Sequence, residues 1–313
     1  MSTTYDTIII GSGPAGYTAA IYCVRAGLLT LILEGAEYGG QLMNTIDIEN
    51  YPGFADPLNG YDLMMAMRQQ CQRLGCTLIS DSVISVKLDN NGKLHSVHTK
   101  DNNYKSRTVI IATGATAKKL DIPSGDLFWN HGISACAVCD GALPMYRNKA
   151  LIVVGGGDTA CEEAIFLSRF ASCVYMLVRT GKMRASHRMK EKVLSNPKIT
   201  ILYFTEVVDA IGTTSSSGNV LTGVKIINTL ASEVTLMPVA GLFYAIGHTP
   251  NTAFLAGVLE TDSVGYLVTE NTKTAIPGVF ACGDVQDKVY RQAITAAGSG
   301  CIAALEAERY LHE

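Results

Sequence analysis

The sequence predicts an α/β protein that contains two doubly wound, Rossmann-like units. A glycine-rich turn, GSGPAG at residues 11–16, follows a short apolar strand and opens a helix. A second turn, GGGDTA at residues 155–160, stands in the same setting. After its helix, each turn is followed by another apolar strand, at 29–33 and at 173–178. The same strand–turn–helix–strand pattern, found twice, indicates an internally duplicated nucleotide-binding fold.

The composition is that of a folded protein with room for two domains. The chain has 313 residues, of which 48% are hydrophobic and 17% charged, and its net charge is -3. This charge offers no basic surface to nucleic acid and no attraction to an anionic membrane. No apolar run reaches about 18 residues, the length that a membrane-spanning helix needs, and residues 1–7 do not resemble a secretory signal. We therefore expect a cytoplasmic protein that binds neither nucleic acid nor membrane.

Each glycine of the first turn has a physical role in binding a dinucleotide. Gly11 permits the tight turn, Gly13 lets the backbone approach a pyrophosphate, and Gly16 lets helix and strand pack closely. The helix N-terminus favours phosphate. Glu34 ends the second strand, where a carboxylate can accept hydrogen bonds from a ribose. The backbone after a third buried strand is expected to meet the nucleotide as well, at Ala112, Thr113 and Gly114.

The second unit ends its second strand in arginine rather than in an acid. Arg179 follows the strand directly, and Arg184 lies five residues later. Arginine at this place can pair with a 2′-phosphate, whereas a carboxylate would favour an unmodified ribose. The alternative is that both arginines belong to a solvated basic face. The first interpretation predicts a site that prefers NADPH to NADH, formed by Gly155, Gly157, Asp158, Thr159, Arg179 and Arg184.

Between the two turns lies a CxxC pair, Cys136 and Cys139, followed at once by Asp140. Such a pair cycles between dithiol and disulfide with little backbone movement, and its thiolate is the reactive form. Asp140 is well placed to move protons to and from departing thiolates, and His131 is a competing candidate for that role. The pair is also half of a zinc site, but structural zinc needs four ligands and the chain has no second CxxC. We therefore predict no metal, and we interpret the seven other cysteines as packing residues.

Segments spread over the whole chain closely resemble the low-molecular-weight thioredoxin reductases, and the fungal and plant forms in particular. They are GSGPAG (11–16), GGQL (39–42), ENYPG (49–53), ATGA (112–115), CAVCDG (136–141), GGGDTACEEA (155–164), AIGHTPN (245–251) and ACGDVQDKVYRQAITAAGSG (281–300). The resemblance implies the three-layer FAD/NAD(P)-binding architecture. It also implies a discontinuous FAD-binding domain, residues 1–115 and 248–313, and an NADPH-binding domain, residues 116–247, that carries the CxxC pair.

The resemblance further implies the activity of a thioredoxin-disulfide reductase that works as a homodimer. Electrons would pass from NADPH through FAD and the Cys136–Cys139 pair to oxidised thioredoxin. Cys139 would lie against the flavin, and Cys136 would attack the disulfide of the protein substrate. The NADPH domain would rotate on linkers near Thr113–Ala117 and Leu242–Gly247. The residues implied to hold FAD are Ser12, Gly13, Pro14, Ala15, Glu34, Gln41, Asn50, Val83, Asp284, Arg291, Gln292 and Ala293.

The chain departs from many relatives at the 2′-phosphate site. They carry His-Arg-Arg and then a further Arg, whereas this chain reads Val178-Arg179-Thr180 and then Arg184. One arginine is lost and two remain, so we expect tighter use of NADPH than of NADH. A rival function is that of a flavin-dependent dithiol oxidase of the same fold, which returns electrons to oxygen. Such oxidases usually lack a working NADPH site. A further rival is a flavoprotein of the same fold that reduces ferredoxin, which would not need the CxxC pair.

Overall fold

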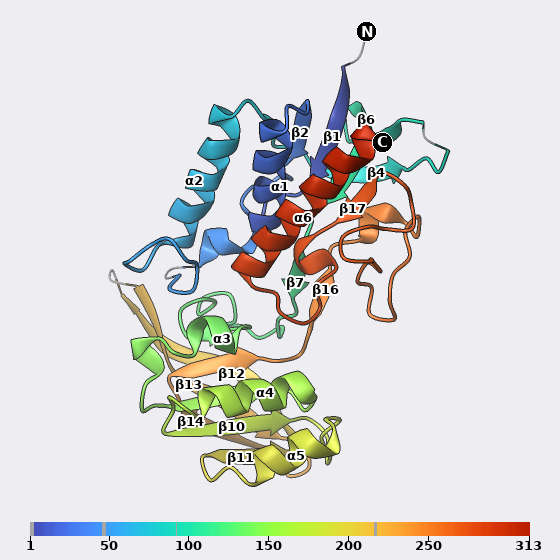
Figure 1. Ribbon diagram of the computed structural model, residues 1–313. Coiled ribbons are helices and arrows are strands. Elements are labelled where there is room, and N and C mark those ends of the chain that lie inside the picture. Colours follow the sequence, from blue (N-terminus) through green and yellow to red (C-terminus); the bar gives the residue numbers. More distant parts are fainter. Residues whose placement is uncertain (1–2, 46–47, 92, 216–217) are drawn as a thin grey trace. The chain divides into compact units, whose positions relative to one another are not determined.

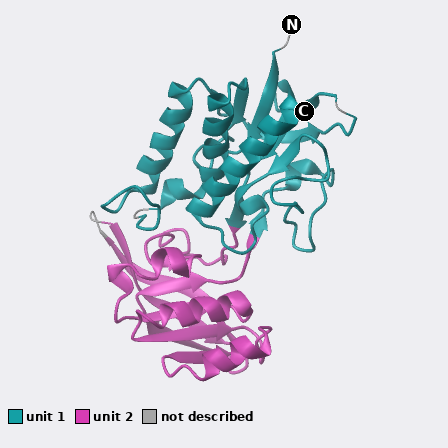
Figure 2. Cartoon of the chain, viewed as in Figure 1, with its two compact units in different colours: residues 1–116, 249–313 teal, residues 117–248 magenta. Residues whose placement is uncertain are grey.

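The computed structural model describes residues 3–45, 48–91, 93–215 and 218–313. The chain divides into two compact units (Figure 2), one comprising Met1–Thr116 with Thr249–Glu313 and the other Ala117–His248. We call them unit 1 and unit 2. The largest sheet of each unit is mainly or wholly parallel and carries helices on one face. The predicted α/β fold class is therefore confirmed.

Unit 1 is built on a seven-stranded sheet. Its strands are β1 (Thr4–Ile10), β2 (Thr30–Leu33), β3 (Thr77–Ile79), β4 (Val83–Lys87), β5 (His95–Thr99), β6 (Asn103–Ile111) and β17 (Val279–Ala281). They are ordered β3-β2-β1-β6-β5-β4, and β17 also pairs with β6. The pairs from β3 to β6 and the β6–β17 pair are parallel, while β4, β5 and β6 form an antiparallel meander.

Three layers make up unit 1. Alternate strand residues such as Ile9 and Ile110 pack against the helices α1 (Pro14–Arg25), α2 (Gly60–Arg73) and α6 (Ala293–His312) on one face of the sheet (Figure 1). Their neighbours, such as Ile8 and Val109, face the meander and the C-terminal segment that holds Leu255. The short helices η1 (Gly40–Asn44), η3 (Ala253–Leu255) and η4 (Gly283–Val285) belong to the loops. No helix in the described residues is both long and apolar enough to cross a membrane.

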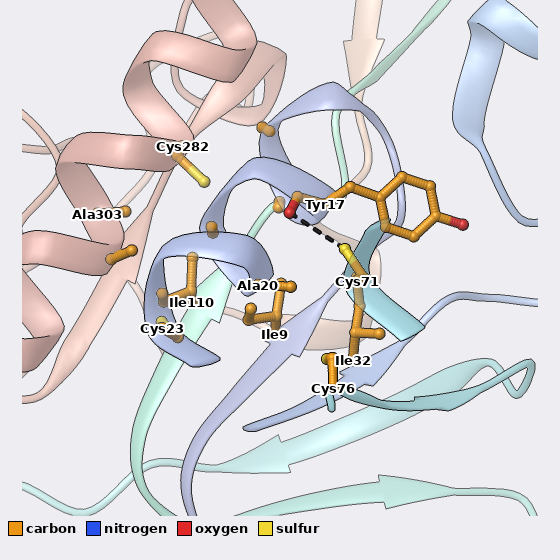
Figure 3. Close-up of a cluster of buried hydrophobic side chains, with 14 of the residues drawn as sticks. Ile9, Tyr17, Ala20, Cys23, Ile32, Cys71, Cys76, Ile110, Cys282 and Ala303 are labelled. Carbon is orange, nitrogen blue, oxygen red and sulfur yellow. Dashed lines mark hydrogen bonds between the residues drawn. The ribbon is translucent and has the colours of Figure 1, made fainter. Parts of the chain in front are cut away.

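Buried cysteines fill part of the helix side of this core. Cys23, Cys71, Cys76 and Cys282 pack among the apolar side chains there (Figure 3). The Cys71 thiol donates to the carbonyl oxygen of Tyr17 at 3.4 Å. Burial raises the pKa of Cys71 and of Cys76 to about 12. Thiols that stay protonated are poor nucleophiles, so these cysteines act as packing residues.

Unit 2 also has three layers, but its strands and helices differ in length from those of unit 1. Its five-stranded parallel sheet is ordered β11-β10-β9-β15-β8, and a separate antiparallel sheet is ordered β12-β13-β14. The strands are β8 (Ile133–Ser134), β9 (Ala150–Val154), β10 (Cys173–Val178), β11 (Ile199–Tyr203), β12 (Thr205–Ser215), β13 (Gly218–Asn228), β14 (Glu233–Pro238) and β15 (Gly241–Tyr244); the helices are α3 (Ala137–Asp140), η2 (Pro144–Tyr146), α4 (Asp158–Leu167) and α5 (His187–Leu194). Val153 and Phe243 pack on the α4 side, and Ile152 and Leu242 pack under β12 and β13.

The two chain connections contain the paired short strands β7 (Ala115–Ala117) and β16 (His248–Pro250). The second connection differs from the linker expected at Leu242–Gly247. Leu242 and Phe243 are fully buried in β15, between β9 and β8. This apolar stretch is needed for the core of unit 2, so the connection begins only after it.

Candidate active site

The first glycine-rich turn joins β1 to α1 and leaves open space beside its backbone. Gly11 has a φ of +110°, and a Cβ atom there would lie 2.3 Å from the carbonyl oxygen of Ala112, so another residue does not fit. Around Gly13, in contrast, no atom lies within 4 Å of a Cβ position. Pro14 then begins α1, where its missing N–H is not needed. Open space at a helix N-terminus fits a pyrophosphate.

Glu34 lies just after β2, but other residues already occupy its carboxylate. Arg68 of α2 forms two hydrogen bonds with it, and the hydroxyl groups of Tyr17 and Ser80 donate to it as well. Arg68 is a residue that the sequence reasoning missed. It lies 34 positions after Glu34 in an ordinary amphipathic helix, and no local signal links the two. The role of Glu34 toward a ribose therefore stays a prediction.

Other residues predicted to hold FAD converge from distant parts of unit 1. The Asn50 amide donates to the Gln292 side chain at 3.4 Å, although 242 positions separate them. The Gln41 amide donates to the carbonyl oxygen of Ala115. Val83 begins β4, directly after the segment whose Asp81 carbonyl accepts the Gly35 N–H at 3.1 Å. Val83 is thus close to the loop that follows Glu34.

Among the described carboxyl groups of unit 1, that of Asp284 has the most strongly shifted pKa. Burial raises its pKa to about 7, Asp287 adds to the increase, and Arg291 opposes it. The η4 turn that carries it lies against the first glycine-rich turn, because a Cβ at Gly283 would come 2.9 Å from the Cβ of Ala15. Gln292 caps α6, so Ala293 is the first helical residue. The sequence-predicted residues at both ends of unit 1 are therefore neighbours.

The second glycine-rich turn joins β9 to α4 and has the same geometry as the first. Gly155 has a φ of +144°, and a Cβ atom there would lie 2.5 Å from the carbonyl oxygen of Ala245. Gly157 faces open space, with no atom within 4 Å of a Cβ position. Asp158 and Thr159 follow as exposed residues in the first turn of α4. This turn also offers room for a phosphate group beside a helix N-terminus.

The segment after β10 folds back onto this second turn. The N–H groups of Arg184 and Ala185 donate to the carbonyl oxygen of Gly156 at 2.7 and 3.0 Å. The Ser186 N–H donates to the Asp158 carboxylate at 2.7 Å. Arg179 and Arg184 are exposed, and neither forms an ion pair within the described part of the chain. Two exposed arginines that form no ion pair in the described residues can bind an additional phosphate.

The CxxC pair forms a disulfide at the start of α3. Cys136 and Cys139 are bonded to each other, with their Cα atoms 5.3 Å apart. Cys136 is half-buried and is the N-cap of α3, while Cys139 is exposed. The Cys139 N–H donates to the Cys136 sulfur at 3.2 Å. In the reduced form, this donor would favour a thiolate on Cys136.

Asp140 is held next to the disulfide by Ser134. The Ser134 hydroxyl donates to the Asp140 carboxylate at 2.6 Å, and the same oxygen accepts the Cys136 N–H at 3.0 Å. Burial raises the pKa of Asp140, and the Ser134 hydrogen bond only partly lowers it. A carboxyl with a raised pKa holds its proton to a higher pH than an ordinary carboxyl does, which suits a general acid. No hydrogen bond in the described residues joins the His131 side chain to Asp140 or to either cysteine.

Sequence reasoning also missed Ser134. Its signal was a single polar residue, two positions before Cys136, in an otherwise apolar segment. Ser134 is only 2% exposed, and a buried hydroxyl normally has hydrogen-bond partners. A polar residue in this apolar segment could therefore have been predicted to form a hydrogen bond within the motif, as Ser134 does with Asp140.

The chain is similar to known proteins over nearly its whole length. A family model described as pyridine nucleotide-disulphide oxidoreductase matches residues 5–300. A thioredoxin reductase of Dictyostelium discoideum is 53% identical over 312 residues, which cover 97% of this chain and 96% of that one. Thioredoxin reductase 1 of Saccharomyces cerevisiae is 49% identical over 312 residues and 97% of both chains. The solved thioredoxin reductase of Giardia duodenalis superposes with a TM-score of 0.92 at 40% identity, over the full length of both chains.

Proposed function

The chain belongs to the pyridine nucleotide-disulphide oxidoreductase family, and from this we propose that it is an NADPH-dependent thioredoxin-disulfide reductase. The observation that carries the proposal is the Cys136–Cys139 disulfide with a hydrogen-bonded acid beside it. That pair lies in a chain with two separate glycine-rich turns, each with open space at its second glycine position, Gly13 or Gly157. Relatives named thioredoxin reductases, which match this chain over nearly its full length at 49–53% sequence identity, support thioredoxin as the substrate.

We propose that unit 1 is the FAD domain. The open space at Gly13, the helix N-termini of α1 and α6, and the carboxyl of Asp284 fit the pyrophosphate and the ribityl chain of this cofactor. Bound at this site, FAD would supply the two-electron chemistry that links NADPH to the disulfide. The other residues of unit 1 that we assign to this site are Ser12, Pro14, Ala15, Gly16, Gln41, Asn50, Val83, Ala112, Thr113, Gly114, Arg291, Gln292 and Ala293.

We propose that unit 2 holds NADPH at the second glycine-rich turn. Gly157 and the first turn of α4 would receive the pyrophosphate, and Arg179 and Arg184 would pair with the 2′-phosphate. The hydrogen bonds from Arg184 and Ala185 to Gly156 support this assignment, because they hold the arginine beside the turn.

The dithiol form of the pair would reduce thioredoxin by thiol–disulfide exchange. Cys136, whose sulfur receives the Cys139 N–H, would attack one sulfur of the thioredoxin disulfide. The other thioredoxin sulfur leaves as a thiolate and takes a proton from Asp140. Cys139 then attacks the Cys136 sulfur, releases the second thioredoxin thiolate and restores the Cys136–Cys139 disulfide. Ser134 keeps Asp140 in place throughout.

We further propose a homodimer in a thiol-reducing compartment such as the cytoplasm. Tyr22 of α1 and Ile302 and Leu305 of α6 are 41–46% exposed on two helices that pack together. An apolar surface of this kind supports burial against a second copy. The seven cysteines outside the CxxC pair are all free thiols, which supports a reducing environment. Light scattering should give twice the mass of one chain; a monomeric mass would contradict the dimer.

The proposed function is tested by NADPH consumption on purified protein. The protein should be yellow, with the visible absorbance of bound flavin. Its oxidation of NADPH should be slow alone and should accelerate when thioredoxin and a reducible acceptor such as insulin are added. A colourless protein, or one that thioredoxin does not accelerate, would remove the proposal.

Cofactor choice gives a first specific prediction. We expect a higher kcat/KM for NADPH than for NADH, because Arg179 and Arg184 would bind the 2′-phosphate. A hydrogen bond to a charged group contributes about 1.5–3 kcal/mol, so Arg184→Ala should lower kcat/KM for NADPH about 10- to 100-fold and leave the value for NADH unchanged. Arg188→Ala, on the exposed part of α5, is the matched control. Equal values for the two cofactors in the unmodified enzyme would contradict this site.

The binding of FAD should depend on pH through Asp284. Its pKa is about 7 without ligand, and a ribityl hydroxyl that donates to it would lower that value. Binding then releases a proton, so the affinity of the apoprotein for FAD should fall as pH drops below about 7, by up to about tenfold per pH unit. Fluorescence titration measures the dissociation constant. The Asp284→Asn variant should bind FAD more weakly, and its affinity should not change with pH in this range. If its affinity still fell below pH 7, another group would be the source of the released proton.

A further inference from the structure

The carboxylate of Glu34 has no position left for an additional donor. Its Oε1 accepts the Tyr17 hydroxyl at 2.8 Å and Arg68 Nε at 2.7 Å. Its Oε2 accepts Arg68 Nη2 and the Ser80 hydroxyl, both at 2.9 Å. A carboxylate has about four acceptor positions, and this side chain is 0% exposed. A ribose hydroxyl would have to displace one of these donors.

Glu34 is ionised in this setting. Burial alone would raise its pKa, but the hydrogen bonds from Arg68, Tyr17 and Ser80 lower it below the ordinary value. A buried carboxylate needs this pairing, because losing its partner leaves an uncompensated charge. The Arg68 pair is therefore an integral part of the end of β2, rather than a loose surface contact.

Arg68 has unused binding capacity on the outer side of that pair. Its side chain is 20% exposed, and its Cζ atom lies 4.7 Å from the centre of the Tyr38 ring. A guanidinium group has five N–H donors, of which two point to Glu34. In residues 3–45, 48–91, 93–215 and 218–313, no other hydrogen bond of its side chain is found. Donors and a planar face are thus left for a ligand.

The Arg68–Tyr38 stack is tied to the first glycine-rich turn. The Gly39 N–H, next to Tyr38, donates to the Ser12 hydroxyl oxygen at 3.0 Å. That hydroxyl in turn donates to the carbonyl oxygen of Glu34 at 2.7 Å. A dinucleotide with its pyrophosphate at this turn extends its adenosine toward the end of β2. The sequence pattern predicts that the adenosine contacts Glu34 at this place. In the structure, Arg68 is the side chain that the adenosine would contact there.

We propose that Arg68, stacked on Tyr38, contacts the adenosine half of FAD, and that Glu34 acts on FAD only by positioning Arg68. The guanidinium plane suits an adenine ring, and its free N–H groups suit the acceptor atoms of adenine and ribose. The inference rests on the proposed FAD site. It makes Glu34 a positioning residue and Arg68 a ligand-binding one.

The test measures binding to the FAD-free protein. Arg68→Lys keeps the charge that Glu34 needs but loses the planar fork, and it should weaken FAD binding about tenfold. ADP, used as a competitor, should lose affinity to the same extent, whereas FMN, which lacks adenosine, should not. Arg73→Lys, at the exposed end of the same helix, should bind all three ligands like the unmodified protein.

A double-mutant cycle separates the two roles. If Glu34 acts only through Arg68, then Glu34→Gln should weaken FAD binding in the unmodified protein and have no further effect in Arg68→Lys. Additive effects of the two changes would overturn the inference. So would an Arg68→Lys protein that melts at a lower temperature but binds FAD and ADP normally, because the pair would then be structural only. If the unmodified protein bound no FAD at all, the proposed function would fail first.

Discussion

Replacing Cys139 with serine is expected to stop turnover and to trap thioredoxin on Cys136. Without its resolving partner, the mixed disulfide formed by Cys136 has no route to release. The reduced variant should be mixed with a single-cysteine thioredoxin that is activated as its thionitrobenzoate disulfide. Mass spectrometry should find one thioredoxin per chain, and NADPH-dependent reduction of ordinary thioredoxin should fall to background.

A Cys136→Ser variant, compared with Cys139→Ser, decides which of the two sulfurs attacks thioredoxin. Exposure alone favours Cys139, since Cys136 is only half-exposed. The Cys139 N–H directed at the Cys136 sulfur favours a thiolate on Cys136. Cys136→Ser should therefore be inactive and form little adduct, while Cys173→Ser, a half-buried cysteine outside the pair, should behave like the unmodified enzyme. An adduct that forms equally fast on Cys136→Ser would reverse the roles of the two sulfurs.

Asp140→Asn is expected to have the second-largest effect. General acid–base catalysis contributes about 10²- to 10⁴-fold, so kcat for thioredoxin reduction should fall within that range while the disulfide and the flavin absorbance remain. Asparagine preserves the size of the side chain and can still accept from Ser134, but it has no proton to give. Stopped-flow measurement of the exchange step isolates this loss from the reduction of the flavin.

The pH profile gives the sign of the Asp140 effect. An acid is active while it is protonated, so the rate should fall as pH rises through the pKa of Asp140, which burial raises. Ser134→Ala removes a hydrogen bond that lowers this pKa. The fall in rate at alkaline pH, the alkaline limb of the profile, should therefore move to higher pH. Ser134→Thr keeps the hydroxyl and should restore the limb, and Asp140→Asn should lack it. A limb that stays in place in Ser134→Ala would mean that another group supplies the proton.

The elements that the sequence predicted well are those whose signal lies in a short stretch of chain. The carbonyl oxygens that exclude a side chain at Gly11 and Gly155 come from the distant residues Ala112 and Ala245. The spacing of the glycines, however, lies within residues 11–16 and 155–160, directly after a strand, so this pattern alone predicted both turns. The long helix at the C-terminus and the CxxC disulfide were found for the same reason.

What the sequence did not predict depends on contacts between distant segments. The hydrogen bonds between Arg68 and Glu34 join a helix to a strand end 34 positions away, and no periodicity encodes them. The resemblance implies a linker at Leu242–Gly247, yet Leu242 and Phe243 belong to β15 in the sheet of unit 2. Ser134 lay within reach of sequence reasoning, but its role needs the fold that brings Asp140 to it.

In the proposed mechanism, electrons from NADPH leave this protein through the CxxC disulfide to thioredoxin. The most direct test follows NADPH, thioredoxin thiols and hydrogen peroxide together in one anaerobic and one aerobic reaction. We expect each NADPH consumed to yield one reduced thioredoxin disulfide, with or without oxygen, and we expect Cys136→Ser to yield none. NADPH consumption that needs oxygen, produces peroxide and proceeds equally without thioredoxin would contradict it.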